Sequence, residues 1–593
     1  MGYLTAGRMP AELPLVPSAM ALAISALSFF FPRGGRLSHR IGVALVAIGC
    51  ALPIALDRFI DPARSSGHAL WEWSAVGGPT IQASYRYDDL AAVAIALTVA
   101  FTGAALAVAG RSERRHPALA ALILALGLVS IALVITDDLV AAIVVLAVVA
   151  IITGLALFAV APGAATGRAA GYLSVGIQAW VLAALLISRQ GSPTFVLARI
   201  PPEAISAGAI LAATLGALLF AGLYPVVAWT VGHGDAESDP GRLGSLVTMP
   251  AGISASLLLL RTLAASDLDV AAIGLPEIGA DARLALVVIV LAVVALTLAR
   301  TSQLPRRPLG IGAIVIVVLL ALPLAGWAHL VLAAAILTTA YAAVVSLAMP
   351  EQWEMVRSDL GLVALWIGIA TASPLAIAGG IVALFARAAV TLAGTLVLVP
   401  HRDYMTFVAG SAVFLVGAIA AGAGAASSGD LGLALLGSFA SALLVALEVV
   451  QVGRRYRIVA VPRDLDVASG AAAALVATLA AVLAVPLTAV VREQLSSSVA
   501  VLPGQVAIIA IAAAAAAILA RTVRPLLPYF ETVAERSTPA MRALDPAPLA
   551  IGAFRVIEGT ATRSSAAFAV FERRGGVWLA TALIVALLVW SVR

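Results

Sequence analysis

Long apolar segments recur along the chain from Leu13 to Val592. A helical segment of about 18 or more apolar residues is long enough to cross a hydrocarbon core of roughly 30 Å. The chain is 62% hydrophobic and only 11% charged, whereas charged residues make up about 25% of a soluble domain. The sequence therefore predicts an all-α, polytopic membrane helix bundle of about 16–18 transmembrane helices without a sizeable soluble domain.

Short polar connections separate the expected spans. The segment 359–399 contains Pro374 and Gly379-Gly380, so it forms either one broken helix or two helices, and the arginine distribution favours two. Another broken helix is expected at Pro225. The expected spans are residues 13–32, 41–58, 89–110, 117–136, 138–160, 170–188, 204–231, 243–264, 283–300, 309–326, 328–349, 359–399, 404–426, 428–452, 467–491, 500–522 and 576–592.

Two segments differ from the spans and divide the chain. Around Gly77-Gly78-Pro79, tryptophan and tyrosine residues predict a small hairpin at the membrane interface. The charged and proline-containing segment before the last span predicts a cytoplasmic interfacial amphipathic segment in two pieces. We expect these regions: 1–58, two N-terminal spans; 59–88, extracytoplasmic hairpin-like loop; 89–264, first helix group; 265–460, second helix group; 461–522, C-terminal spans; 523–575, amphipathic segment; 576–593, final span.

All 36 basic residues are arginine, and no lysine is present. Arginine clusters fall in nearly alternate loops, within residues 33–40, 111–115, 300–307 and 454–463. The positive-inside rule places these loops in the cytoplasm and the N-terminus outside, so we expect a multi-pass protein of the cell inner membrane. The net charge of +5 is an orientation signal and does not indicate nucleic-acid binding. The single cysteine, Cys50, excludes an internal disulfide and a cysteine-ligated metal.

Five short motifs occur in order along the expected spans: Tyr87-Asp88-Asp89-Leu90, Thr136-Asp137-Asp138-Leu139, Leu223-Tyr224-Pro225-Val226-Val227-Ala228-Trp229, Thr248-Met249-Pro250-Ala251-Gly252 and His329-Leu330. Taken together, they resemble the antiporter-like membrane subunits shared by respiratory complex I, Mrp cation/proton antiporters and membrane-bound hydrogenases. No single motif is specific, and their order and the topology carry the resemblance. It implies a non-catalytic subunit associated with proton or cation translocation, with other membrane subunits as partners.

The chain departs from this family at the residues that would move protons. The positions where the family carries ionisable relay residues hold Ala147, Phe220, Pro250, Ala333, Leu337 and the apolar run Ile381–Ala383. An arginine guanidinium does not release its proton in a protein, so it cannot replace a titrating lysine. We therefore expect a scaffold subunit whose own ion path is degenerate or absent.

Five polar residues within or beside the spans are the remaining ion-path candidates. Glu448 is either a titrating or ion-binding site, or a hydrogen-bonded carboxyl at a helix contact. Arg387 is its counter-ion or, as we prefer, a residue that fixes a helix end. His329 is a proton relay or an interfacial hydrogen-bonding residue. Asp137 and Asp138 are expected to cap the following helix, with a proton entry as the alternative.

No cofactor or metal site is expected. The polar loop at 233–239 has spacing too loose for a metal site, and Arg261 is expected to extend to the membrane interface. Two other functions remain open at this point. One is a glycosyltransferase using a lipid-linked sugar, with Asp57 and Asp61 beside Arg58 in an external loop, and the other is a secondary transporter.

Overall fold

The structure is a computed structural model. It describes residues 66–74, 79–87, 89–109, 117–160, 164–223, 239–266, 326–348, 353–396 and 404–458, with isolated positions near 525–532. All of them belong to one of two compact units, formed by 1–277 and 324–538. The expected spans at 13–32, 41–58, 283–300, 467–491, 500–522 and 576–592 lie outside the described residues, as do Asp57, Arg58, Asp61 and nearly all of 309–326 and 523–575.

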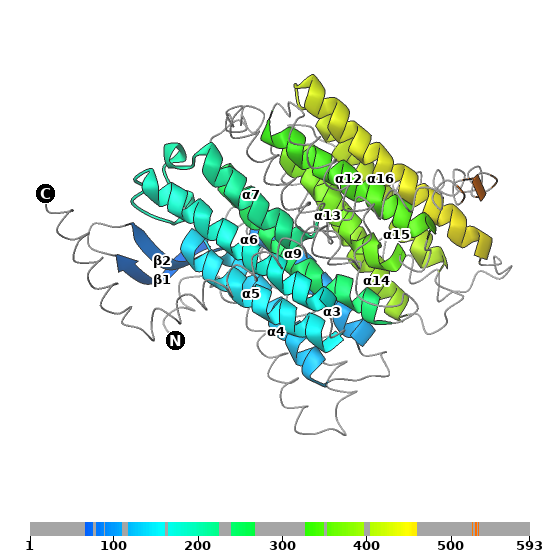
Figure 1. The fold of residues 1–593 in the computed structure, drawn as a ribbon, viewed down its shortest axis with the longest axis horizontal. Helices are drawn as coiled ribbons and strands as arrows, with labels where there is room; N and C mark the ends of the chain where they lie inside the picture. The colour runs from blue at the N-terminus through cyan, green and yellow to red at the C-terminus, as the bar shows by residue number, and fades with distance from the viewer. Residues whose placement is uncertain are drawn as a thin grey trace, which may run out of the picture. The chain divides into compact units, whose positions relative to one another are not determined.

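A two-stranded antiparallel hairpin precedes the first described helices. Its strands are β1 (Ser66–Ser74) and β2 (Thr80–Tyr87), so the predicted hairpin is present. The helices that follow are α3 (Asp89–Ala109), α4 (Pro117–Ile135), α5 (Leu139–Val160), α6 (Ala164–Arg189), α7 (Ala207–Ala221) and α9 (Asp239–Ala264), with short 3-10 turns at Leu197–Arg199 and Pro202–Ala204. Figure 1 shows the hairpin beside the ends of these helices.

A second run of helices begins at Trp327. It comprises α12 (Trp327–Ala348), α13 (Trp353–Thr371), α14 (Pro374–Leu396), α15 (Tyr404–Ala426) and α16 (Leu431–Ile458). The two runs pack against each other through contacts of α14 with α3 and of α13 with α9. The described part of the chain is therefore a helix bundle, as the apolar segments predict.

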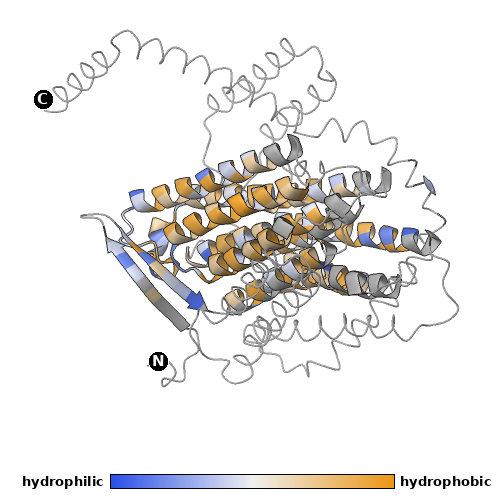
Figure 2. Cartoon of the chain, turned by 90° about the horizontal axis from the view of Figure 1, so that it is seen from below, coloured by the Kyte–Doolittle hydropathy of each residue, from blue (hydrophilic) through white to orange (hydrophobic). Residues whose placement is uncertain are grey.

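Four of the described helices are long and apolar enough to cross a membrane, judged by length and composition. They cover Leu139–Val160, Ala169–Arg189, Leu243–Ala264 and Leu431–Arg454. The apolar window in α9 is 94% buried, because five other helices surround α9, whereas that in α5 is only 39% buried. Hydrophobic residues dominate the helices (Figure 2). The protein is thus embedded in a membrane, with α9 central and α5 partly facing outward.

The turn at Ala372 and Ser373 resolves the segment around Pro374 into two helices. Pro374 begins α14, where a proline costs no helical hydrogen bond. A Cβ atom placed on Gly380 would lie 2.3 Å from the Cα of Leu365, so the two backbones are in direct contact. Close approaches recur in antiparallel order along the pair: Gly361 opposite Leu384, Gly368 opposite Ile377 and Gly380 opposite Leu365.

The same type of contact joins α14 to α15. A Cβ atom on Gly379 would lie 2.5 Å from the backbone of Ala421, and one on Gly417 would lie 2.6 Å from the carbonyl oxygen of Gly379. Small residues allow helices to approach closely in lipid, where dispersion contacts replace the hydrophobic effect as the driving force. The helices α13, α14 and α15 therefore form a block held by backbone-to-backbone packing.

The replacement Gly380→Ala tests this packing. The added methyl group meets the backbone of Leu365, and we expect it to lower the free energy of unfolding by about 1–3 kcal/mol. The control is Gly154→Ala in α5, where nothing lies within 4 Å of the new Cβ atom. In this control we expect the free energy of unfolding to rise by about 0.5–1 kcal/mol, because alanine favours a helix more than glycine does. Thermal unfolding in one detergent measures both, and equal midpoints would contradict the proposed backbone contact.

Candidate functional site

An ion pair inside the bundle joins α14 to α16. Arg387 donates from Nη1 to Oε1 of Glu448 at 3.0 Å and from Nη2 to Oε2 at 2.7 Å. The two side chains are 1% and 0% exposed. Such a bidentate arrangement is the geometry that best offsets the cost of placing two charges in an apolar interior. Arg387 is therefore the counter-ion of Glu448. The preferred prediction, that Arg387 fixes a helix end, is replaced by this pairing.

Phe414 on α15 lies directly beside the pair. The guanidinium carbon of Arg387 is 3.6 Å from the centroid of the Phe414 ring, which is a cation–π contact. Because α15 packs against both α14 and α16, the Arg387 side chain reaches Glu448 across the side of α15. One guanidinium group thus contacts side chains from two neighbouring helices.

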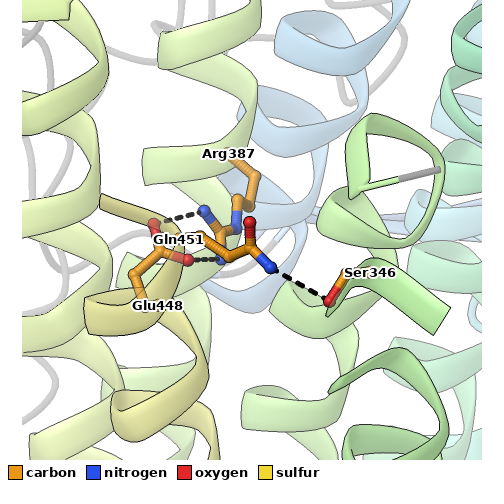
Figure 3. A network of polar contacts seen from close by, with 4 residues as sticks. All are labelled: Ser346, Arg387, Glu448 and Gln451. Carbon is orange, nitrogen blue, oxygen red and sulfur yellow. Dashed lines mark hydrogen bonds and ion pairs between the residues drawn. The ribbon is translucent and has the colours of Figure 1, made fainter. Parts of the chain in front are cut away.

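Two further hydrogen bonds connect α16 to α12. Gln451, one helical turn after Glu448, donates from Nε2 to Oγ of Ser346 at 3.0 Å, and Arg454 donates to the Ser346 carbonyl oxygen at 2.8 Å. Figure 3 shows Gln451 between the ion pair and Ser346. Arg454 follows Glu448 by six residues, or about 9 Å along a helix axis. The polar network therefore occupies the half of α16 nearest its arginine-rich end.

Beyond their first residues, the helices of the first run contain no acidic side chain and no histidine. After Asp89, none of the helices from α3 to α7 contains an aspartate, glutamate or histidine, and neither does the Leu243–Ala264 part of α9. A half-channel for protons needs side chains whose pKa can move across neutrality. These described helices provide no such side chain.

Bulky aromatic residues fill the space between these helices. Phe220 on α7 is fully buried, and a Cβ atom on Gly176 of α6 would lie 2.9 Å from its ring. In the same way, a Cβ atom on Gly216 of α7 would lie 2.6 Å from Cδ1 of Trp180. The glycines of one helix accommodate rings of the other, so α6 and α7 pack without an intervening polar path.

Hydrogen bonds satisfy the indole groups of two buried tryptophans. Trp327 donates from Nε1 to Thr214 at 2.7 Å, and Trp366 donates to Ser256 at 3.0 Å. Both bonds join the two runs of helices, because Thr214 lies on α7 and Ser256 on α9. No sequence pattern indicates these pairs, whose members are 113 and 110 residues apart.

Asp138 caps α5 and ties it to the hairpin. Its Oδ1 accepts hydrogen bonds from the backbone N–H groups of Val140 and Ala141 at 2.9 and 3.0 Å, and its Oδ2 accepts one from Gln82 at 2.9 Å. Burial raises the pKa of the Asp138 carboxyl, and these donors act in the opposite direction. The neighbouring Asp137 donates its backbone N–H to Ser84 at 2.9 Å. The cap expected from the sequence is present at Asp138.

Arg261 on α9 contacts the end of α4. Its guanidinium donates to the carbonyl oxygens of Val134 and, at 3.2 Å, of Thr136, which lie at the C-terminal end of α4. A cation there neutralises the partial negative charge of the helix end and pairs carbonyl groups that have no helical donor. Arg261 therefore stabilises the C-terminal end of α4.

His329 stands apart from the ion pair, in the first turn of α12. A Cβ atom on Gly432 of α16 would lie 2.9 Å from its Nε2 atom, so the imidazole packs closely against the start of α16. Of the predicted candidates, the structure brings together only Arg387 and Glu448. In the described part of the chain, no group of three histidine, cysteine or acidic residues is placed to hold a metal ion.

The arrangement of helices defines a polytopic membrane protein, and comparison with solved structures identifies its fold. The chain is similar to a subunit in the structure of the Mrp complex from Dietzia sp. DQ12-45-1b, with a TM-score of 0.57 and 15% identity, covering 93% of this chain and 60% of that one. It is also similar to a subunit of the membrane-bound sulfane sulfur reductase, an archaeal respiratory membrane complex (TM-score 0.54, 13% identity, covering 84% and 99%). A third match is to respiratory complex I from Thermus thermophilus with bound aureothin (TM-score 0.50, 15% identity, covering 80% and 97%).

These matches confirm the fold that the sequence motifs implied. The chain has the fold of the antiporter-like membrane subunits found in such multi-subunit complexes. No protein-family model matches the chain, and no curated protein matches its sequence.

The pairing of Arg387 with Glu448 is tested by a double-mutant cycle. Arg387→Met and Glu448→Leu each leave one buried charge without its partner, and we expect each to lower the free energy of unfolding by about 3–5 kcal/mol. The double variant Arg387→Met/Glu448→Leu should recover most of this loss, since both charges are gone. Thermal unfolding in detergent measures the cycle. Additive losses in the double variant would argue against a direct interaction.

Proposed function

We propose that this chain is an antiporter-like membrane-arm subunit of a complex I-like or hydrogenase-like, ion-translocating assembly. In this proposal its own ion path is degenerate or absent, and its role is that of a scaffold. The fold shared with subunits of three membrane complexes supports the first part. The second part rests on the residues inside the bundle.

The observation that carries the scaffold role is that, after Asp89, the described helices from α3 to α7 contain no aspartate, glutamate, histidine or lysine. Proton transfer through a bundle requires groups that change charge near neutral pH. Here Phe220 and Trp180 are both fully buried between α6 and α7. Replacing a buried pair of charges with packed apolar groups is often neutral for stability. A subunit of this kind keeps its fold after losing its relay.

The Arg387–Glu448 pair supports the same role. A guanidinium does not release its proton in a protein, and its two parallel hydrogen bonds hold the partner carboxylate in one geometry. The pair therefore acts as a fixed structural contact between α14 and α16. A conducting path that uses Glu448 as its titrating group is the competing version, and the experiment below separates the two.

The proposal includes partners and an orientation. Other membrane subunits of the complex and the lipid bilayer are the partners, and protons or monovalent cations are carried by the assembly. We place the protein in the cell inner membrane with its N-terminus outside, because the arginine clusters fall in alternate loops. Redox or transport chemistry belongs to the partner subunits.

Ion flux in proteoliposomes tests the scaffold role. We expect the purified full chain to move protons no faster than protein-free liposomes under an imposed membrane potential, measured with a pH-sensitive dye inside the vesicles. The double variant Arg387→Met/Glu448→Leu, which is expected to remain folded, should behave identically. Flux that is present in the native chain and lost in the double variant would establish Glu448 as part of a path and refute the scaffold role.

Copurification tests the assembly. After mild solubilisation of native membranes, we expect the tagged chain to retain membrane subunits of a redox or antiporter complex, identified by mass spectrometry. The Gly154→Ala variant, altered only on an open surface of α5, serves as a matched control for the pull-down. A monomeric chain that transfers sugar from a polyprenyl carrier would instead support the glycosyltransferase alternative and overturn this proposal.

A further inference from the structure

The outer strand of the hairpin exposes two large aromatic side chains. Trp71 and Trp73 on β1 are 59% and 49% exposed. They are paired with Ala83 and Ile81 of β2, so they lie two residues apart on one face of the hairpin. Other large tryptophans in the described bundle, such as Trp180 and Trp366, are completely buried. This exposure on β1 has no role in the proposed scaffold.

Backbone hydrogen bonds hold the hairpin at a defined level of the bundle. On the side of β2 opposite β1, Thr80 accepts a hydrogen bond from Phe195 at 3.1 Å, and Ser84 accepts one from Asp137 at 2.9 Å. The Oδ2 atom of Asp138 accepts the Gln82 N–H at 2.9 Å. Thus β2 is fixed to the residues that begin α5, and β1 is the outermost strand of this layer (Figure 1).

The level of this layer follows from the length of α5. The helix has 22 residues, or about 33 Å, which matches a hydrocarbon core of roughly 30 Å. The start of α5 therefore lies at the boundary between hydrocarbon and headgroups. Strands are about 4.8 Å apart, so β1 is no more than about 10 Å from that boundary. The headgroup layer is about 5–8 Å thick on each side, so β1 lies in this layer or at its outer edge.

The exposed side of α5 continues from this boundary. Its outward residues form a stripe of large apolar side chains at helical spacing: Val144, Val148, Ile151, Leu155 and Phe158. Such a stripe faces acyl chains in a membrane. Tryptophan, with an apolar ring and one N–H donor, is the residue type enriched at the headgroup level next to such surfaces.

We infer that the Trp71–Trp73 face of β1 is a membrane-interface anchor that binds the phospholipid headgroup layer at the end of α5. The indole rings lie at the level of the glycerol and upper acyl chains, and their N–H groups donate to lipid carbonyl or phosphate oxygens. Because β2 is bonded to the start of α5, this anchor fixes the depth of the helix in the bilayer. The inference is independent of whether the subunit conducts ions.

Fluorescence quenching of the full chain in phospholipid vesicles tests this anchor. The vesicles contain phosphatidylethanolamine and phosphatidylglycerol, with phosphatidylcholine brominated either high on the acyl chain or near its end. The emission of Trp71 and Trp73 is obtained by subtracting the spectrum of the Trp71→Phe/Trp73→Phe variant. Phenylalanine keeps the preference for a strand, so this variant is expected to fold like the native chain.

We expect shallow bromines to remove most of the difference emission, and deep bromines or aqueous iodide to remove little. The control is the difference emission of Trp366, from Trp366→Phe, which should resist shallow bromines and iodide because the indole is enclosed by helices. Strong quenching by iodide without quenching by bromines would place the rings in water and overturn the inference. Protection of the Trp71–Trp73 emission from all quenchers would mean that protein covers the face, and would overturn it equally.

Discussion

The structure depends on the rule that a charge inside an apolar bundle must have a partner. Glu448 is fully buried, and the two hydrogen bonds from the Arg387 guanidinium offset the free energy lost when its carboxylate leaves water. The arginine in turn rests on the ring of Phe414, so three helices take part in solvating one ion pair. An arginine is suited to this structural task because its charge is permanent and its fork matches a carboxylate. The same permanence makes it a poor carrier of protons.

In the described helices of the first run, acidic and basic side chains lie near the helix ends, so no isolated charge is buried midway along them. Between α6 and α7, aromatic rings pack against glycines, as Phe220 does against Gly176. Polar residues gather where backbone groups need partners, as Asp138 does at the start of α5 and Arg261 at the end of α4. Polarity in this part of the protein therefore serves helix ends and helix contacts.

Hydropathy was sufficient to predict the described helices, because length and apolarity alone decide which segments cross a bilayer. The hairpin followed from its aromatic and turn residues, and the cap at Asp138 from its place before an apolar run. The sequence leaves two roles open for Arg387, one of them as the counter-ion of Glu448. It cannot decide between them, because the two residues are 61 positions apart and their contact depends on how α15 packs between α14 and α16. Gln451 was detectable in principle, one turn from Glu448. Nothing in the sequence marked Phe414 or the pairing of Trp366 with Ser256.

The glycine contacts of α13, α14 and α15 have a mechanical consequence. Where backbones touch, as at Gly380 and Leu365, neither helix can slide or rotate without collision, and no gap remains for water to enter. The three helices must move together or not at all. If a neighbouring protein displaced α13, the block would move as one rigid body, and α15 would be displaced by a similar distance.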